Sequence, residues 1–443
     1  MGFHGTAANT VEAARPDTGR RAVRTLWAAC VVGGFAQSLT GTASSLLAHE
    51  VGGPSAAGLP QTAQVAGAAA AAALAGRLTA SFGRAPTLAA GAAAAAAGSL
   101  VVVSGALVSV LALIVAGSAL LGAGGAAVML CRYAAAETAT EAMRPKAMAS
   151  VLTATTIGAV AGPNLLAPAS RAAEGLGLPV LSGAYVFGAA SFALMAVVIM
   201  AGPRSRPAAG PAALPGGPVQ AASAAPGLAV LALSNLVMIA VMTMTPVQMD
   251  HTGGGFVGIG LMVSAHIAGM FAPAPVSARL VTRFGARRAA ALAGAVMAGA
   301  CVLAVADARS AVVLAVAMTL LGAGWNLGLV SGSSLLTASL PRELRLRRES
   351  LGEVVMGVAA AVGGLACGPV MALGGYTVLA AGGAVAAALI PGLVGRLERR
   401  LPPYESGRVR GGFDAVAVWR TMGGPGRRET NRILEGNRGD EPN

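Results

Sequence analysis

Apolar stretches, each long enough to cross a lipid bilayer, occupy most of residues 24 to 397. A membrane-crossing helix needs about 20 predominantly apolar residues, whereas a membrane-crossing β-strand shows about 10 residues of alternating polarity. The stretches here are of the first kind. The chain is 55% hydrophobic and 11% charged, whereas soluble domains carry about 25% charged residues. The sequence therefore predicts an all-α membrane protein.

Twelve spans can be drawn, in two sets of six. The pentapeptide Leu-Leu-Gly-Ala-Gly at Leu120–Gly124 recurs at Leu320–Gly324, and Gly162-Pro163 recurs at Gly368-Pro369. We therefore expect twelve transmembrane helices in two pseudo-symmetric six-helix bundles, an arrangement in which two repeats can move around one central site. The predicted spans are 24–47, 57–79, 86–106, 109–132, 145–168 and 180–202, then 227–249, 256–280, 287–306, 310–335, 350–372 and 376–397.

The two sets of spans define the expected division of the chain. The segment that joins them is rich in proline, alanine and glycine, which predicts an extended, semi-flexible linker. The tail is charged, glycine-rich and poor in large apolar residues, which is typical of disorder. The predicted parts are an N-terminal segment 1–23, a first bundle 24–202, a linker 203–226, a second bundle 227–397 and a tail 398–443.

The basic residues separate by side of the membrane. If the spans alternate in direction, every lysine and arginine except Arg171 and Arg309 falls on the same side as the chain termini. Loops rich in Lys and Arg stay in the cytoplasm, so we expect a multi-pass protein of the cell membrane with both termini and the linker cytoplasmic. The net charge of +13 then indicates contacts with anionic membrane lipids rather than with nucleic acid.

The sequence contains no complete motif of an enzyme, a metal site or a cofactor site. The four cysteines have no paired spacing, and Gly53 stands where a zinc-protease motif beginning at His49-Glu50 requires a second histidine. The single lysine, Lys146, follows a proline and not the glycine of a phosphate-binding loop. We expect a protein that is not an enzyme and that holds no cofactor or metal.

The loop after the second span contains Gly76, Arg77, Gly83 and Arg84, and its counterpart in the second half contains Arg279, Gly285 and Arg287. This pattern resembles the signature loop of the major facilitator superfamily, in which small residues allow tight packing and an acid–base pair latches one conformation. Ala80 stands where that acid is expected, so the latch is incomplete. The resemblance implies a carrier of two six-helix bundles.

The fifth span contains Gly158, Gly162 and Pro163. It resembles the glycine-proline signature of drug–proton antiporters of that superfamily, although a purely structural role stays open because glycines four apart also allow close helix packing. Ser118 stands where many proton-driven exporters of the family carry an arginine. The segments 243–249 and 266–271 are similar to an actinobacterial, drug-efflux-like subgroup.

Four ionisable residues are candidates for proton coupling. His266 is the deepest in the predicted spans, and an ionisable side chain inside a membrane is a functional candidate by default. Asp250 and His251 end the seventh span on the external side, and Glu50 lies beside His49 at the equivalent end of the first. The alternatives are a neutral, hydrogen-bonded histidine at 266 and solvated loop ends at the other positions.

Two spans of the second half offer candidates for the lining of a central cavity. Asn235, Met238 and Met242 follow each other at near-helical spacing, and methionine adapts to ligands of varied shape. Trp325 and Asn326 lie in the tenth span, which lines the cavity in the family that the chain resembles. Ordinary packing between helices is the alternative for the methionines.

These observations predict a secondary carrier that works by alternating access and couples the efflux of small amphipathic molecules to protons. We expect a monomer whose partners are a small-molecule substrate, the proton and membrane lipids. A proton-coupled nutrient importer and a non-transporting scaffold or sensor with the same fold are the alternatives.

Overall fold

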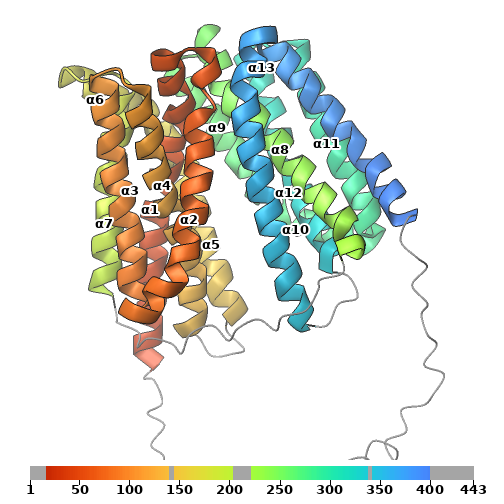
Figure 1. Ribbon diagram of the computed structural model, residues 1–443, viewed down its shortest axis with the longest axis horizontal. Coiled ribbons are helices and arrows are strands. Elements are labelled where there is room, and N and C mark those ends of the chain that lie inside the picture. Colours follow the sequence, from red (N-terminus) through yellow and green to blue (C-terminus); the bar gives the residue numbers. More distant parts are fainter. Residues whose placement is uncertain (1–15, 139–143, 203–220, 338–341, 400–443) are drawn as a thin grey trace, which may run out of the picture. The chain divides into compact units, whose positions relative to one another are not determined.

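The computed structural model describes residues 16–138, 144–202, 221–337 and 342–399. Every element in these ranges is a helix (Figure 1). Helices satisfy all of their backbone hydrogen bonds within one segment, which a chain in lipid requires. The helices belong to one compact unit, Met1–Arg399, and the second unit, Arg400–Asn443, lies outside the described residues.

The described residues of the first half form seven α-helices and two short 3-10 helices. They are α1 (Pro16–Gly52), η1 (Pro54–Ala56), α2 (Leu59–Phe82), α3 (Arg84–Leu107), α4 (Leu111–Thr138), α5 (Arg144–Ala161), η3 (Gly162–Leu165), α6 (Leu166–Gly175) and α7 (Ser182–Ala201). The second half forms α8 (Ala221–His251), α9 (Gly255–Phe271), α10 (Ala274–Phe284), α11 (Ala286–Ala306), α12 (Ala311–Thr337) and α13 (Arg342–Arg399).

Ten segments of the described chain are long and apolar enough to cross a membrane. One of them, Leu351–Leu397, has 47 residues, about twice the length of one crossing. Within it α13 reverses direction (Figure 1) at Gly375, whose φ is 71°, between the predicted spans 350–372 and 376–397. The first predicted span lies in α1, which is not among the ten segments. The all-helical membrane class is confirmed, and the number twelve stays a prediction.

Two predicted boundaries differ from the structure. Residues 221–226, expected in the linker, form the first turns of α8; the alanines there are strong helix formers. Residues 16–23 likewise belong to α1. The other residues of the predicted N-terminal segment and linker, 1–15 and 203–220, and the tail from 400 lie outside the described residues.

Glycines bring neighbouring helices into backbone contact. A Cβ atom on Gly98 of α3 would lie 2.6 Å from the carbonyl oxygen of Gly117 in α4, and one on Gly117 would lie 2.5 Å from the carbonyl oxygen of Gly98. Small residues let helices approach this closely in lipid. The abundance of glycine therefore has a packing role at such crossings.

The glycines of the signature loops, in contrast, are required by their backbone conformation. Gly83 connects α2 to α3 with φ 87° and ψ 168°, and Gly285 connects α10 to α11 with φ 83° and ψ 152°. A Cβ on Gly83 would come no closer than 4.0 Å to Pro86, and one on Gly285 would meet no atom within 4 Å. Close packing, which we expected at these two positions, does not explain them. Glycine is required there because only glycine adopts these angles without strain.

The signature loop of the first half carries an ion pair that was not expected. Arg84 at the start of α3 pairs with Glu137 at the end of α4. The acid that is missing at Ala80 is thus supplied by a neighbouring helix. The pair ties the loop to α4, although both side chains are partly exposed and such pairs stabilise a fold by only about 0–1 kcal/mol.

We expect Gly83→Ala to reduce both thermal stability and transport, because any side chain at this φ and ψ adds strain of about 1–3 kcal/mol. Gly299→Ala is the matched control, since Gly299 lies inside α11 and its added Cβ would meet no atom within 4 Å. Unfolding temperatures of the two purified variants check this, and equal temperatures would show that the loop relaxes without cost.

Candidate functional site

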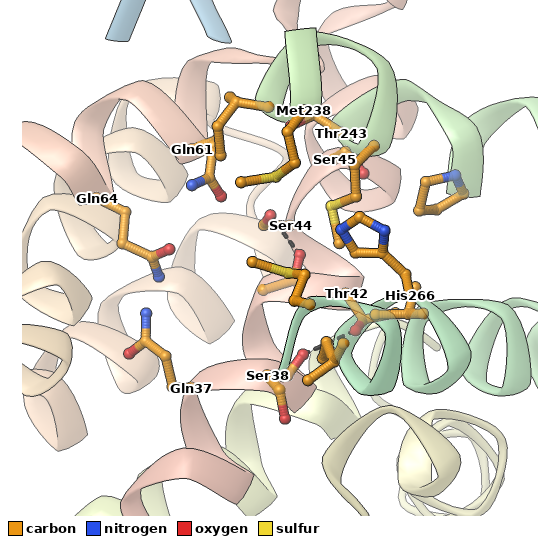
Figure 2. Close-up of a pocket in the computed structure, with 17 residues that line it drawn as sticks. Gln37, Ser38, Thr42, Ser44, Ser45, Gln61, Gln64, Met238, Thr243 and His266 are labelled. Atoms are coloured by element: carbon orange, nitrogen blue, oxygen red, sulfur yellow. Dashed lines mark hydrogen bonds between the residues drawn. The ribbon is translucent and has the colours of Figure 1, made fainter. Parts of the chain in front are cut away.

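A cavity of about 220 Å³ lies between the two halves of the chain. It is formed by α1 and α2 of the first half and by α8 and α9 of the second, so each half contributes its first two long helices (Figure 2). The residues that line it are Gln37, Ser38, Gly41, Thr42, Ser44, Ser45, Gln61, Gln64, Met238, Ile239, Met242, Thr243, Pro246, Val263, His266, Ile267 and Met270.

The wall from the first half is polar. Three glutamines reach it from α1 and α2, and Figure 2 shows the side chains of Gln37 and Gln64 pointing toward one another. The hydroxyl groups beside them donate to backbone carbonyls of their own helix. Thr42 donates to Ser38 at 2.7 Å and Ser44 donates to Gly41 at 2.7 Å. Because their protons are used in this way, these hydroxyl oxygens offer lone pairs rather than protons to the cavity.

The wall from the second half is apolar apart from Thr243 and His266. Met238, Met242 and Met270 supply flexible, polarisable side chains. Two of them, Met238 and Met242, are cavity residues that the sequence predicted. The cavity therefore has one hydrogen-bonding wall and one wall that adapts to apolar shapes.

His266 is the only ionisable side chain among the seventeen described residues that line the cavity. The residue is 1% exposed, and its Nδ1 lies 2.7 Å from the carbonyl oxygen of Met318 in α12. A carbonyl can only accept, so Nδ1 carries the proton and Nε2 of the neutral ring is an acceptor. Nε2 is buried and has no hydrogen-bond partner among the described residues. This atom is the one titratable acceptor among the described residues that line the cavity.

The repeated pentapeptide places two of the lining residues. Gly122 of α4 packs against α2 at the carbonyl oxygen of Gln64, and Gly322 of α12 packs against α9 at the carbonyl oxygen of His266. A side chain at either glycine would collide with that backbone. The sequence repeat thus corresponds to two equivalent helix crossings, each of which holds a polar cavity residue in position.

Three predicted cavity residues are not among those that line this cavity. Trp325 donates from Nε1 to Oδ1 of Asn235 at 3.0 Å, and Asn235 donates to the carbonyl oxygen of Met356 at 2.7 Å. Asn326 donates to the carbonyl oxygen of Met270 at 2.7 Å and accepts from the hydroxyl of Ser277 at 2.6 Å. These side chains connect helices within the second half, because buried polar groups pair with whatever partner is near.

Hydrogen bonds join the two halves from the middle of the helices to the end remote from Pro16. Ser264 of α9 donates to the carbonyl oxygen of Val160 at 2.7 Å and accepts from Asn164 at 2.8 Å. Thr62 in the first turns of α2 is 3.3 Å from the carbonyl oxygen of Ala361 in α13. Our sequence reasoning did not identify these contacts.

The glycine-proline segment of the fifth predicted span lies at this junction. Gly158 and Gly162 pack directly on the backbone of α1, where a Cβ would collide with the carbonyl oxygens of Val31 and Phe35. The carbonyl oxygen of Pro163 in turn lies against Gly260 of α9. The segment therefore connects helix packing in the first half to the contact between the halves.

The two acid–histidine pairs meet at the same end. Nε2 of His49 lies 2.9 Å from Nε2 of His251, with the rings 4.8 Å apart edge to face. Glu50 and Asp250 are exposed beside them. Partial burial, followed by the neighbouring His251, lowers the pKa of His49 below its ordinary value, and the nearby Asp250 opposes this shift. The contact between His49 and His251 joins the first half of the chain to the second.

Comparison with known proteins gives the family. The sequence model of the Major Facilitator Superfamily matches residues 26–258 and 227–427. The chain belongs to the Major Facilitator Superfamily. Two Bacillus subtilis (strain 168) proteins, both described as uncharacterized MFS-type transporters, are 32% identical to it: YddS, over 79% of this chain and 84% of its own length, and YdeG, over 82% and 89%. This superfamily protein is therefore a multi-pass membrane transport protein for a small molecule and not an enzyme.

Solved structures share its fold. An auto-inhibited POT family peptide transporter superposes with a TM-score of 0.66 at 14% identity, covering 87% of this chain and 98% of its own. A bacterial homolog of the human lysosomal transporter Spinster, in an inward-facing and occupied conformation, gives 0.62 at 12% identity and covers 88% and 98%. The human organic anion transporter MFSD10 gives 0.58 at 17% identity and covers 85% and 99%.

The polar wall of the cavity was missed by the sequence reasoning. Gln37 interrupts the first predicted span, and Gln61 and Gln64 lie one helical turn apart at the start of the second. Uncharged polar side chains are costly in lipid unless they face protein or water. Attention to amides as well as to ionisable residues would have identified them.

Proposed function

We propose that this superfamily member is a secondary carrier that works by alternating access and exports a small amphipathic molecule in exchange for protons. The observation that carries the proposal is the cavity between the halves, where the unpartnered Nε2 of His266 faces an otherwise uncharged lining. A proton can bind at this atom, since imidazole changes charge near neutral pH.

The junction between the halves supports the alternating-access part of the proposal. The His49–His251 contact lies beyond the cavity at the end of the helices remote from Pro16, and the hydrogen bonds of Ser264 and Thr62 join the halves beside residues that line the cavity. With the predicted topology that end is external, so the described conformation has its external end held shut. Breaking and remaking these few contacts would let the two halves exchange access.

Proton movement in everted membrane vesicles tests the coupling. When respiration has acidified the lumen, addition of a transported compound should release protons through an exchanger and restore the fluorescence of a pH-sensitive dye. A proton-coupled importer should instead acidify right-side-out vesicles during uptake of the compound. Vesicles that respond in neither way, with every compound that a deletion-strain susceptibility screen selects, would indicate a scaffold or sensor.

Labelling of introduced cysteines should test the orientation in the plasma membrane, with both termini cytoplasmic. Leu176 follows α6 and is 72% exposed, and Phe82 ends α2 beside the basic loop and is 69% exposed. The native cysteines Cys30, Cys131, Cys301 and Cys367 are buried and contribute little background.

We expect an impermeant maleimide to label Leu176→Cys in intact cells and to label Phe82→Cys only after permeabilisation, because the charge distribution places Arg171 outside and Arg84 inside. The reverse pattern would invert the topology and with it the direction in which the closed end faces.

A further inference from the structure

The polarity of the cavity carries information about the ligand. Among the described lining residues, two fully buried acceptors have no hydrogen-bond partner, Oε1 of Gln37 and Nε2 of His266. They come from opposite halves of the chain. A buried acceptor without a partner has lost its hydrogen bonds to water without replacement, which is unfavourable. A ligand that donates hydrogen bonds to both atoms would offset this loss, whereas a ligand with only acceptors would not.

The neighbouring hydroxyls strengthen the same preference. Ser38, Thr42 and Ser44 donate to carbonyl oxygens of α1, at 3.2, 2.7 and 2.7 Å. Their oxygens therefore add lone pairs to those of Gln37 and His266. A ligand whose polar edge carries hydroxyl or N–H groups can use these oxygens together with Gln37 and His266, while the amide N–H groups of the three glutamines can donate to an acceptor on the same edge.

The absence of charge in the lining selects against ions. No Asp, Glu, Lys or Arg occurs among the seventeen described residues that line the cavity, and the neutral ring of His266 adds none. Moving an ion from water into such a site is unfavourable unless an opposite charge compensates it. This distinguishes the cavity from one suited to peptides or organic anions, although structural neighbours with those substrates share the fold.

The apolar wall completes the description. It is formed by Met238, Met242 and Met270 together with Ile239, Val263 and Ile267. Methionine side chains adapt their shape and make favourable contacts with aromatic rings. A flat apolar body with its polar edge turned toward Gln37 and His266 fits both walls.

We propose that the substrate class of this transporter is an uncharged amphipathic molecule with hydrogen-bond donors on one edge, and that Nε2 of His266 is its specificity-determining acceptor. The inference rests on the proposed carrier function, whose cavity it describes.

Four naphthalene derivatives with one apolar body test the class. They are 2-naphthol, which donates a hydrogen bond; 2-methoxynaphthalene, which cannot; 2-naphthoate, an anion; and 2-naphthylmethylammonium, a cation. Binding to the purified full chain in lipid nanodiscs is measured at about pH 7.5, where an unperturbed histidine is neutral, with empty nanodiscs as the reference for partition into lipid.

We expect 2-naphthol to bind about 3- to 10-fold more tightly than 2-methoxynaphthalene, the factor that one net hydrogen bond supplies, and both ions to bind more weakly than either. Equal affinity for 2-naphthol and its methyl ether would overturn the role of the acceptor. Tighter binding of either ion, or no binding of 2-naphthol, would overturn the substrate class.

Variants locate the effect. His266→Phe keeps an aromatic ring without the acceptor and should abolish the preference for 2-naphthol, whereas His266→Gln should retain part of it through its amide oxygen. Gln37→Leu gives a second test if His266→Phe fails to fold. Its matched control is Gln248→Leu, because the Gln248 amide donates to the carbonyl oxygen of Ala308, away from the cavity.

This binding experiment separates the substrate class from the carrier function. Binding of 2-naphthol without proton movement in vesicles would leave the class standing and refute coupled transport. Proton movement driven by a charged compound, with no binding of 2-naphthol, would leave the carrier standing and refute the class.

Discussion

His266→Gln is expected to give a folded transporter that no longer responds to a pH gradient. The amide of glutamine can donate toward Met318 and present an oxygen to the cavity, so the fold and part of the ligand binding should survive. Glutamine has no titratable group, and His266 is the only titratable side chain among the described residues that line the cavity. The component of transport that the gradient drives should therefore fall to background, while downhill exchange continues.

Transport in proteoliposomes with and without an imposed gradient measures this effect, with unfolding temperature as the check on folding. Wild-type pH dependence in His266→Gln would mean that the ring is structural. Coupling would then run through Asp250 and Glu50 or would be absent.

Acidification of the external side should open the contact between His49 and His251. Their 2.9 Å Nε2–Nε2 contact needs one ring to donate and the other to accept, so two protonated rings would repel at this distance. Burial and His251 lower the pKa of His49 in the closed state. The contact is therefore fully present above the ordinary histidine pKa of about 6.5 and is lost as the pH falls through the lowered value.

Distances between spin labels on Ser55, which is exposed in η1, and Thr252, each of which follows one of the two histidines, should show this transition. A short distance is expected at pH 8 and a longer one at pH 5. The paired exchange His49→Gln with His251→Gln is the matched control, because glutamines can hydrogen-bond but do not titrate. An identical pH response in that variant would assign the opening to other groups.

Asp250→Asn should move the same transition to lower pH. Asp250 raises the pKa of His49 against the effects of burial and His251, so its removal makes protonation harder. At a fixed external pH fewer molecules would open, and we expect a partial loss of pH-driven transport. A shift to higher pH would contradict this assignment of the charges around His49.

The sequence determined the class of the fold because the bilayer imposes a simple rule. Backbone polar groups must pair within a segment and apolar residues must cover its surface, so the length of each apolar stretch sufficed to predict helices. The repeated pentapeptide indicated the duplication, and the positions of the basic residues predicted the topology. His266 was identified by the same rule. An ionisable side chain inside an apolar span is energetically costly, so it is a functional candidate by default.

Tertiary structure decided which polar residues meet. Asn235, Trp325 and Asn326 had the composition of a binding site, but their hydrogen bonds connect α12 to α8, α9 and α10, and α8 to α13. Gln37, Gln61 and Gln64 looked unremarkable in the sequence and line the cavity. Helix periodicity gives the face on which a side chain lies, whereas its partner depends on the rotation and crossing of another helix. The joining of His49 to His251, and of His266 to Met318, follows from that packing alone, because residues so far apart in the chain are brought together only when the helices cross.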